Sequence, residues 1–213
     1  MKTDELVAML AAGAPAVPPR AATRRLARAL WLGLPVSVAI MLLEYGVRRD
    51  LQEVVAWPMF WVKLLFPLGI AVAGFVAVQR LARPGVHVGG ARVALVLPVL
   101  LVWAMALVAW WGAPAETRAT LLWGSTWRSC VFSIGLMAAP VFAGAFFALK
   151  GLAPTRPAWA GAAAGAMAGG AGAAVYALHC PELAAPFLAV WYVAGIALPV
   201  LLGAALGPRL LRW

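Results

Sequence analysis

Residues 158–178 read AWAGAAAGAMAGGAGAAVYAL, an uncharged apolar stretch in which glycine recurs at positions 161, 165 and 169. About 20 apolar residues are enough for a helix to cross the hydrocarbon core of a bilayer. Small residues at four-residue spacing let two helix backbones approach closely, and Gly203 and Gly207 repeat that spacing later in the chain. The stretch therefore predicts a membrane-spanning helix that packs tightly against its neighbours.

The composition of the whole chain agrees with a membrane protein. Of 213 residues, 65% are hydrophobic and 11% are charged, and the mean hydropathy is +0.93. A soluble domain carries roughly a quarter charged residues. The net charge of +10 would suit nucleic acid, but the basic residues lie between apolar segments, where they set orientation. We therefore expect a lipid bilayer as the environment and no direct contact with nucleic acid.

Five further apolar segments accompany the glycine-rich one. In chain order the six segments are about 29–47, 62–79, 92–112, 129–149, 158–178 and 187–207. They predict an all-α, polytopic membrane protein with six transmembrane helices in one bundle. The second segment is the least clear of the six. Lys63 stands at its start, where a long side chain can snorkel to the membrane interface.

The basic residues predict the orientation of this bundle. Six crossings put both termini on one side, and that side carries 12 of the 17 basic residues: Lys2, Arg20, Arg24, Arg25, Arg28, Arg80, Arg83, Arg92, Lys150, Arg156, Arg209 and Arg212. The other side carries Arg48, Arg49, Lys63, Arg118 and Arg128. Cytoplasmic loops are enriched in Lys and Arg, so both termini are expected in the cytoplasm.

The N-terminal segment 1–12, MKTDELVAMLAA, predicts a short amphipathic helix that Thr3 or Asp4 can cap. Its larger apolar residues share one face at i, i+3, i+4 spacing: Leu6, Met9 and Leu10. Residues 13–20 contain three prolines and predict an extended linker. The helix is either a frayed cytosolic cap or a docking peptide whose apolar face fits a groove on a partner.

The face opposite the termini is expected to carry more structure. Asp50-Leu51-Gln52-Glu53 has the form of a capping box and predicts a short surface helix over 50–57, with a second over 115–123. Seven of the eleven tryptophans map to this face: Trp57, Trp61, Trp110, Trp111, Trp123, Trp127 and Trp191. They either anchor the interface, as indoles generally do, or stack over a buried site.

Two cysteine motifs are expected at the same face. Cys130 ends the run GSTWRSC (124–130), and Cys180 lies in His-Cys-Pro-Glu (179–182). The chain has no other cysteine. Two thiols with the His179 imidazole could form a disulfide, a soft-metal site, or a switch between them. A plain disulfide is the structural alternative, because thiols outside the reducing cytoplasm often pair for stability.

Enzymatic activity is not expected. The chain has no CxxC, no HExxH and no phosphate-binding glycine loop. Almost nothing ionisable falls at mid-membrane, whereas proton and ion pathways normally need buried charges. A small metal transporter or a membrane thiol redox protein is the alternative function. Met105 and Met137 could fall at mid-membrane depth, but no string of further ligands continues from them.

Blocks along the chain resemble the NrsF family of membrane anti-sigma factors. The resemblance covers essentially the whole sequence and is carried by MKTDEL at the start, the stretch from Asp50 that ends in PMFWVK, GSTWRSC, PTRP at 154–157, ALHCPE, VWY at 190–192 and the closing GPRLLRW. It implies six transmembrane helices in a bacterial inner membrane. It also implies a short cytoplasmic N-terminal segment that holds an extracytoplasmic-function sigma factor.

The resemblance also implies roles for particular residues. Residues 1–28 would form the sigma-binding segment with its basic linker, and residues 29–213 a transmembrane sensor domain. The sigma factor would contact Asp4, Glu5, Leu6, Met9 and Leu10. Metal or redox stress would act at Cys130, Cys180 and His179, which could bind a soft ion such as Cu(I). No obligatory cofactor is expected, and the glycine-rich helix could serve either internal packing or a homo-oligomer.

Overall fold

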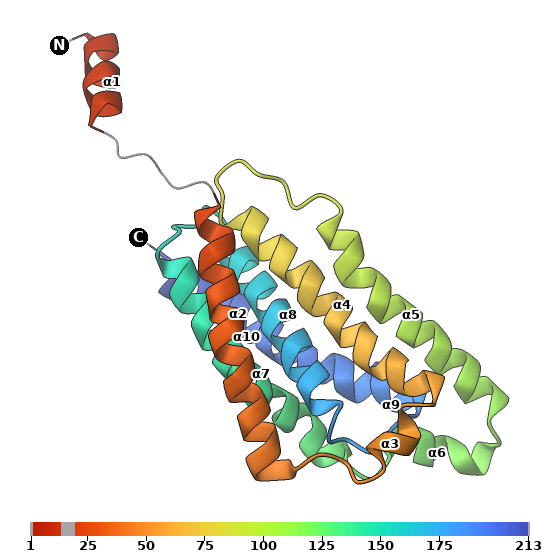
Figure 1. Ribbon diagram of the computed structural model, residues 1–213. Helices are drawn as coiled ribbons and strands as arrows, with labels where there is room; N and C mark the ends of the chain where they lie inside the picture. Colours follow the sequence, from red (N-terminus) through yellow and green to blue (C-terminus); the bar gives the residue numbers. More distant parts are fainter. Residues whose placement is uncertain (1, 14–19, 213) are drawn as a thin grey trace.

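The protein is described here by a computed structural model that covers residues 2–13 and 20–212 (Figure 1). These residues form helices joined by turns and loops, and they contain no strand. In chain order the helices are α1 (Thr3–Ala12), α2 (Ala21–Ile40), the π-helix η1 (Met41–Tyr45), α3 (Leu51–Val54), α4 (Pro58–Leu81), α5 (Ala91–Gly112), α6 (Ala115–Trp123), α7 (Trp127–Lys150), α8 (Pro157–Tyr176), α9 (Ala185–Phe187), the π-helix η2 (Leu188–Tyr192) and α10 (Val193–Leu210). The predicted all-α class is confirmed for the described residues.

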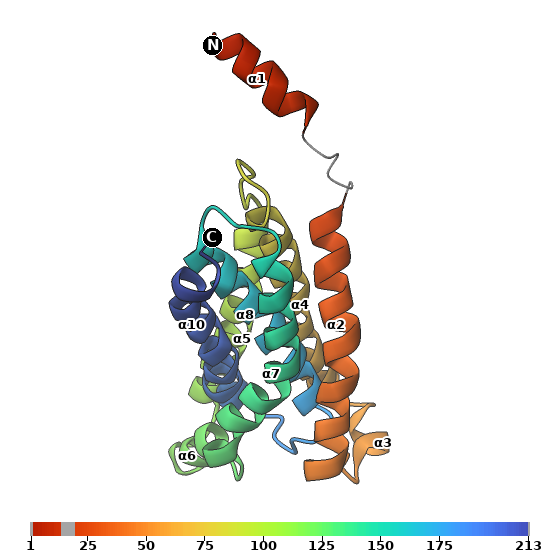
Figure 2. The same ribbon diagram turned by 90° about the vertical axis from the view of Figure 1, so that its left-hand side faces the viewer.

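The long helices lie side by side in one bundle (Figures 1 and 2). The beginning of α2, the α4–α5 and α7–α8 connections and the end of α10 lie together at what we call the terminus end. The short helices α3 and α6 and the loop that follows α8 lie at the opposite end, called the cysteine end. The two ends therefore carry the segments that the sequence assigned to opposite faces of a membrane.

Five helical stretches are long and apolar enough to cross a membrane. They are Ala21–Tyr45, Pro58–Leu81, Ala91–Gly112, Ala115–Lys150 and Ala185–Leu210. The helix α8 is also long enough, with 20 residues, but its alanines and glycines make it less hydropathic than those five. The structure thus supports a membrane protein with five candidate spans among the described residues. The sixth crossing and the cytoplasmic location of the termini stay predictions.

The glycine-rich helix α8 occupies the centre of the bundle. Every residue from Ala163 to Tyr176 is buried, and the helix packs against α10, α4 and α7. Toward α10, a Cβ on Gly161 would collide with the backbone carbonyl of Gly203, and one on Gly165 with that of Pro199. Close helix approach at small residues is how membrane helices gain packing energy. The predicted tight packing is therefore present.

Two further glycines of α8 let α4 and α7 approach it closely. A Cβ on Gly170 would lie 2.5 Å from the carbonyl oxygen of Pro67 in α4, and one on Gly172 would lie 2.6 Å from the backbone nitrogen of Ala138 in α7. Three helices thus approach α8 at backbone contact distance, and the glycines serve packing within one chain. A homo-oligomer formed through another face stays a prediction.

The observed helices match the predicted segments except near their ends. The helix α2 begins at Ala21 rather than near residue 29, because the arginines at 24, 25 and 28 belong to the helix. The domain boundary predicted after residue 28 therefore falls inside α2. Residues 14–19, the greater part of the predicted proline linker, lie outside the described residues.

Two capping predictions were wrong. Neither Thr3 nor Asp4 caps α1, which instead begins after Lys2, whose backbone N–H donates to the Glu5 carboxylate at 3.1 Å. The helix predicted over 50–57 is only the four-residue α3, and the Asp50 side chain makes no capping hydrogen bond. The second predicted surface helix, 115–123, is confirmed as α6.

Candidate sensing site

Both cysteines lie at the cysteine end, each next to the end of a central helix. Cys130 is in the first turn of α7, and Cys180 follows α8 in the loop that leads to α9. Both are free thiols, both are fully buried, and they share one apolar cluster. Thr126 connects them: its carbonyl accepts the Cys130 N–H at 3.0 Å, and its hydroxyl oxygen lies 3.9 Å from the Cys180 sulfur. The fold brings together the two motifs that the sequence paired.

The two motifs also touch through Glu182. Its carboxylate accepts hydrogen bonds from the backbone N–H and the hydroxyl of Ser125, both at 2.7 Å. Gly124 makes this contact feasible, because its φ of +53° suits glycine and a Cβ there would lie 2.6 Å from the Glu182 carboxylate. The short runs GSTWRSC and HCPE therefore form one surface, with a cysteine from each run beneath it.

Lys63 of α4 holds the loop that contains Cys180 and Glu182, called the cysteine loop. The prediction that its side chain snorkels to the interface was wrong, because Lys63 is fully buried. Its ammonium donates to the Cys180 carbonyl and, at 2.8 Å, to the Glu182 carbonyl. It also lies 5.5 Å from the centre of the Tyr192 ring, within cation–π range. These carbonyls and the ring replace the water that the ammonium loses on burial.

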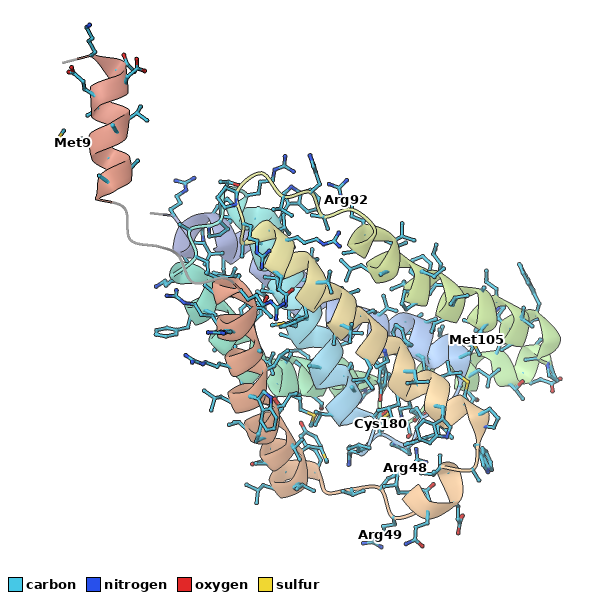
Figure 3. All side chains as sticks on the ribbon, turned by 45° about the horizontal axis from the view of Figure 1, so that its top comes forward. Met9, Arg48, Arg49, Arg92, Met105 and Cys180 are labelled. Atoms are coloured by element: carbon cyan, nitrogen blue, oxygen red, sulfur yellow. The ribbon has the colours of Figure 1, made fainter. Side chains whose placement is uncertain are left out.

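Arg48 reaches the same loop from the other direction (Figure 3). Its guanidinium donates to the Cys180 carbonyl at 3.1 Å, and its backbone N–H donates to the Leu178 carbonyl at 3.1 Å. The other guanidinium nitrogens bind the Asp50 carboxylate at 2.7 and 2.8 Å. The Arg48 hydrogen bond lowers the pKa of Asp50 to about 2, and the same bond raises the pKa of Arg48. Asp50 thus orients Arg48 toward the cysteine loop instead of capping α3.

His179 packs beside the thiols without joining them in a recognisable metal site. Its Nδ1 donates to the Gly46 carbonyl at 2.9 Å, and its ring lies 5.1 Å from Tyr45 and 5.8 Å from Tyr176, centre to centre. Among the described residues, no three His, Cys, Asp or Glu side chains are grouped so as to hold a metal ion. The predicted role of His179 as third ligand stays a prediction, and the structure assigns it to fixing the 46–50 loop.

Several polar residues of this site were not predicted. Ser133 donates to the Tyr45 hydroxyl at 3.0 Å, and the Tyr192 hydroxyl is buried without a hydrogen-bond partner in the described part of the chain. Both tyrosines lie in π-helical turns, η1 and η2, and such turns are frequent at functional sites. Lys63 could have been found, because an ionisable residue inside an apolar segment is itself a signal of function.

Three tryptophans close the cysteine end. The rings of Trp123, Trp127 and Trp191 lie 4.9 to 5.5 Å apart, centre to centre. The Trp191 indole donates to the Leu122 carbonyl at 2.9 Å, and Trp127 and Trp191 pack against the cluster that contains both cysteines. The rings meet edge-on or tilted, at 40° to 67° between their planes, so stacking of the tryptophans over a buried site stays a prediction. Trp57 and Trp111 are exposed, as interface anchors would be.

Among the described residues, nothing covers the apolar face of the N-terminal helix α1. None of its residues is buried. The side chains of Leu6, Met9 and Leu10 are 38%, 61% and 65% exposed, although leucine and methionine are usually buried in folded proteins. The acidic residues Asp4 and Glu5 lie in the first turn, where carboxylates favour the helix dipole.

Comparisons with known proteins agree with these features. A sequence model of the family NrsF, "Negative regulator of sigma F", matches residues 10–213. The chain is 45% identical over 213 residues to the "Probable anti-sigma-F factor NrsF" of Azospira oryzae, with 100% of both chains covered. It is 40% identical over 220 residues to the "Anti-sigma-F factor NrsF" of Caulobacter vibrioides, again with 100% of both chains covered. No solved structure matches. The resemblance found in the sequence blocks is therefore confirmed, and the chain belongs to the NrsF family of negative regulators of sigma F.

Proposed function

We propose that this protein is a membrane anti-sigma factor that holds an extracytoplasmic-function sigma factor through α1. The names of its two relatives support an anti-sigma role. The observation that supports placing the binding site on α1 is the exposed apolar face of this folded helix, formed by Leu6, Met9 and Leu10. An amphipathic helix of this kind binds by laying its apolar face into a groove of the partner. Sequestration at the membrane would keep the sigma factor away from RNA polymerase.

The terminus end is proposed to face the cytoplasm of a bacterial inner membrane, and the cysteine end the periplasm. The helix ends and loops gathered at the terminus end carry most of the basic residues of the chain, as the cytoplasmic side of a membrane protein does. The N-terminal segment would then reach the compartment that contains sigma factors.

Cys130 and Cys180 are the proposed sensor, as ligands of a soft ion such as Cu(I) or as a redox pair. Thiolates select soft ions, and binding a metal requires both thiols to lose their protons. Lys63 and Arg48, which both donate to the Cys180 carbonyl, are the nearby cations that would offset the added negative charge. Two thiols in one buried cluster are the observation that supports this role.

The signal is proposed to cross the membrane through α8. This helix ends just before His179 and Cys180 and packs against α10, α4 and α7. Interiors packed this closely respond to strain by shifting as rigid elements. A change at Cys180 would move α8 against its neighbours and weaken the hold of the N-terminal segment on the sigma factor.

The docking role is tested by charge substitutions on α1. Leu6→Asp and Leu10→Asp place a carboxylate in the groove-facing surface, where burying it unpaired is costly. We expect the full-length variants to reach the membrane and to lose the sigma factor on co-purification. The matched control is Ala8→Asp, which adds the same charge to the opposite face of the helix. Equal retention of the sigma factor by all three variants would contradict docking through this face.

The topology has its own test. After reduction of intact cells, a membrane-impermeant thiol reagent small enough to enter the cysteine end should label Cys130 and Cys180. Because both thiols are buried, the labelling is also carried out on Leu10→Cys in a Cys130→Ser/Cys180→Ser background, where the added thiol is the single cysteine and is exposed. Leu10→Cys should be labelled only after lysis. Labelling of the α1 cysteine in intact cells would place the terminus end outside.

A further inference from the structure

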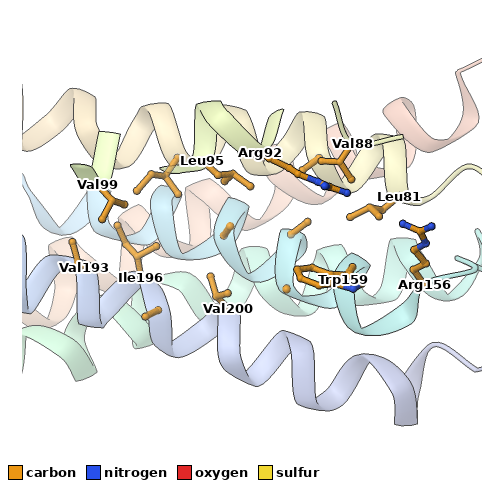
Figure 4. A pocket seen from close by; sticks show the side chains of 16 residues that line it. Leu81, Val88, Arg92, Leu95, Val99, Arg156, Trp159, Val193, Ile196 and Val200 are labelled. Carbon is orange, nitrogen blue, oxygen red and sulfur yellow. The ribbon is translucent and has the colours of Figure 1, made fainter. Parts of the chain in front are cut away.

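A cavity of about 600 Å³ opens between α4, α5, α8 and α10 in the half of the bundle near the terminus end (Figure 4). Apolar side chains line most of it, among them Leu95 and Val99 of α5 and Ile196 and Val200 of α10. The cavity exists because α5 packs on α4 and, at the cysteine end, on α9, but has little contact with α8 or α10. The small alanines of α8 on this side leave the space open.

The cavity extends over the depth of one bilayer leaflet. Along α4 its lining runs from Ile70 to Leu81, a distance of about 16 Å at the helical rise of roughly 1.5 Å per residue. Half of the hydrocarbon core of a bilayer is about 15 Å thick. An apolar groove of this length matches one acyl chain.

Two arginines stand at one end of the groove, as Figure 4 shows. Arg92 is the second residue of α5 and Arg156 precedes α8, and both line the cavity. Neither guanidinium has a hydrogen bond or an ion pair to any described residue, whereas the nearby Arg80 donates to the Val88 carbonyl at 2.7 Å. Trp159, 69% exposed, lines the same end, and indoles favour the level of lipid headgroups. This end of the groove therefore carries two guanidinium groups that are available to bind an anionic headgroup.

We propose that this groove binds an anionic glycerophospholipid, with one acyl chain along α5, α8 and α10 and the phosphate between Arg92 and Arg156. Guanidinium groups bind phosphate through charge-assisted hydrogen bonds, and basic pockets between membrane helices take anionic lipids. An acidic protein surface could satisfy the arginines but would leave the groove unfilled. The inference requires that the helices cross a bilayer, and it is independent of the proposed sigma-factor and cysteine roles.

The test measures lipid retention by the full-length protein with native mass spectrometry. The probes are 1-palmitoyl-2-oleoyl phosphatidylglycerol and the phosphatidylcholine with the same chains. We expect the wild type to retain the anionic lipid about tenfold more than the zwitterionic one, and Arg92→Gln/Arg156→Gln to lose that preference. The matched control is Arg83→Gln/Arg209→Gln, which removes two exposed charges from the same end outside the groove. It should change retention less than twofold.

A second variant tests the groove without changing charge. Ala162→Phe places a ring in the space between α8 and α10 and should reduce retention of both lipids, while a thermal melt in detergent checks that the variant is folded. Equal binding of the two lipids by the wild type would overturn the proposal, and so would equal losses in the two arginine double variants. Unchanged lipid retention with loss of the sigma factor in Arg92→Gln/Arg156→Gln would assign these arginines to the protein partner instead.

Discussion

The cysteine end and α1 differ in how firmly the rest of the chain holds them. At the cysteine end, Cys130, Cys180 and Lys63 are fully buried, and the Cys180 carbonyl alone receives two cationic donors. On α1 no residue is buried, and its apolar face has no partner within the described chain. A buried site can respond only to small agents such as ions or oxidants, whereas an exposed apolar face is suited to a protein partner. The difference supports a division between sensing and binding.

The helix α8 runs from the terminus end to the cysteine end and is the proposed path of the signal, so the largest effect is expected there. Gly165→Leu would force a side chain into the backbone carbonyl of Pro199, which cannot move without displacing α10. Overpacking of this severity belongs with the mutations that cost more than about 4 kcal/mol. We expect little folded protein in the membrane, measured by immunoblot and by thermal unfolding in detergent.

The matched control for α8 lies in α4. A Cβ on Gly69 would lie 3.6 Å from a side-chain carbon of Pro98, an ordinary contact distance. Gly69→Ala should therefore accumulate like the wild type. If Gly165→Leu accumulated equally well, α8 would not be the tightly packed link between the two ends.

Lys63 offers a way to loosen the cysteine end alone. Lys63→Met keeps most of the buried volume but leaves the Glu182 carbonyl without its donor, while the Cys180 carbonyl keeps its hydrogen bond from Arg48. An unsatisfied buried carbonyl costs about 1–3 kcal/mol, so we expect a loss of about 1–3 kcal/mol in the free energy of unfolding. Lys150→Met, at an exposed position of α7, should change stability by less than about 0.5 kcal/mol. Equal stabilities of the two variants would show that Lys63 does not hold the loop.

The smallest effect concerns the pair of Arg48 and Asp50. Because the Asp50 pKa is lowered to about 2 from its ordinary 3.8, the folded state favours the carboxylate. The stabilisation is present above pH about 3.8 and is lost as pH falls toward 2. Asp50→Asn should therefore lower the melting temperature slightly at neutral pH, with the difference from wild type vanishing near pH 2. Glu53→Gln, on exposed α3, is the control; a difference that persisted unchanged at pH 2 would exclude this ion pair as its source.

Much of the bundle could be predicted from the sequence, because membrane-spanning helices need long apolar runs and those runs are visible residue by residue. The packing role of Gly161 and Gly165 was also readable, since spacing alone puts small residues on one helix face. The start of α2 was missed because Arg24 and Arg28 read as loop charges, although arginine is a good helix former.

The cysteine end was only partly predictable. The sequence brought Cys130 and Cys180 to one end through topology, and the fold bears this out. What it could not show is which polar groups satisfy one another across loops distant in the chain. Lys63 and Arg48 read as interface residues, and only their contacts with the Cys180 carbonyl reveal that they hold the loop. Asp50 fitted a capping pattern, yet its carboxylate makes two hydrogen bonds to the Arg48 guanidinium instead.

The most direct test of the proposed division between the two ends is release of the sigma factor by metal in cysteine variants. The full-length wild type, Cys130→Ser, Cys180→Ser and the double variant are each co-purified with the sigma factor, with and without Cu(I), and membrane protein levels are measured in parallel. If the two thiols act as one switch, all three variants should retain the sigma factor and fail to release it with metal, without additivity between them. Reduced protein level with release in the absence of metal would contradict the account and leave the cysteines as structural residues.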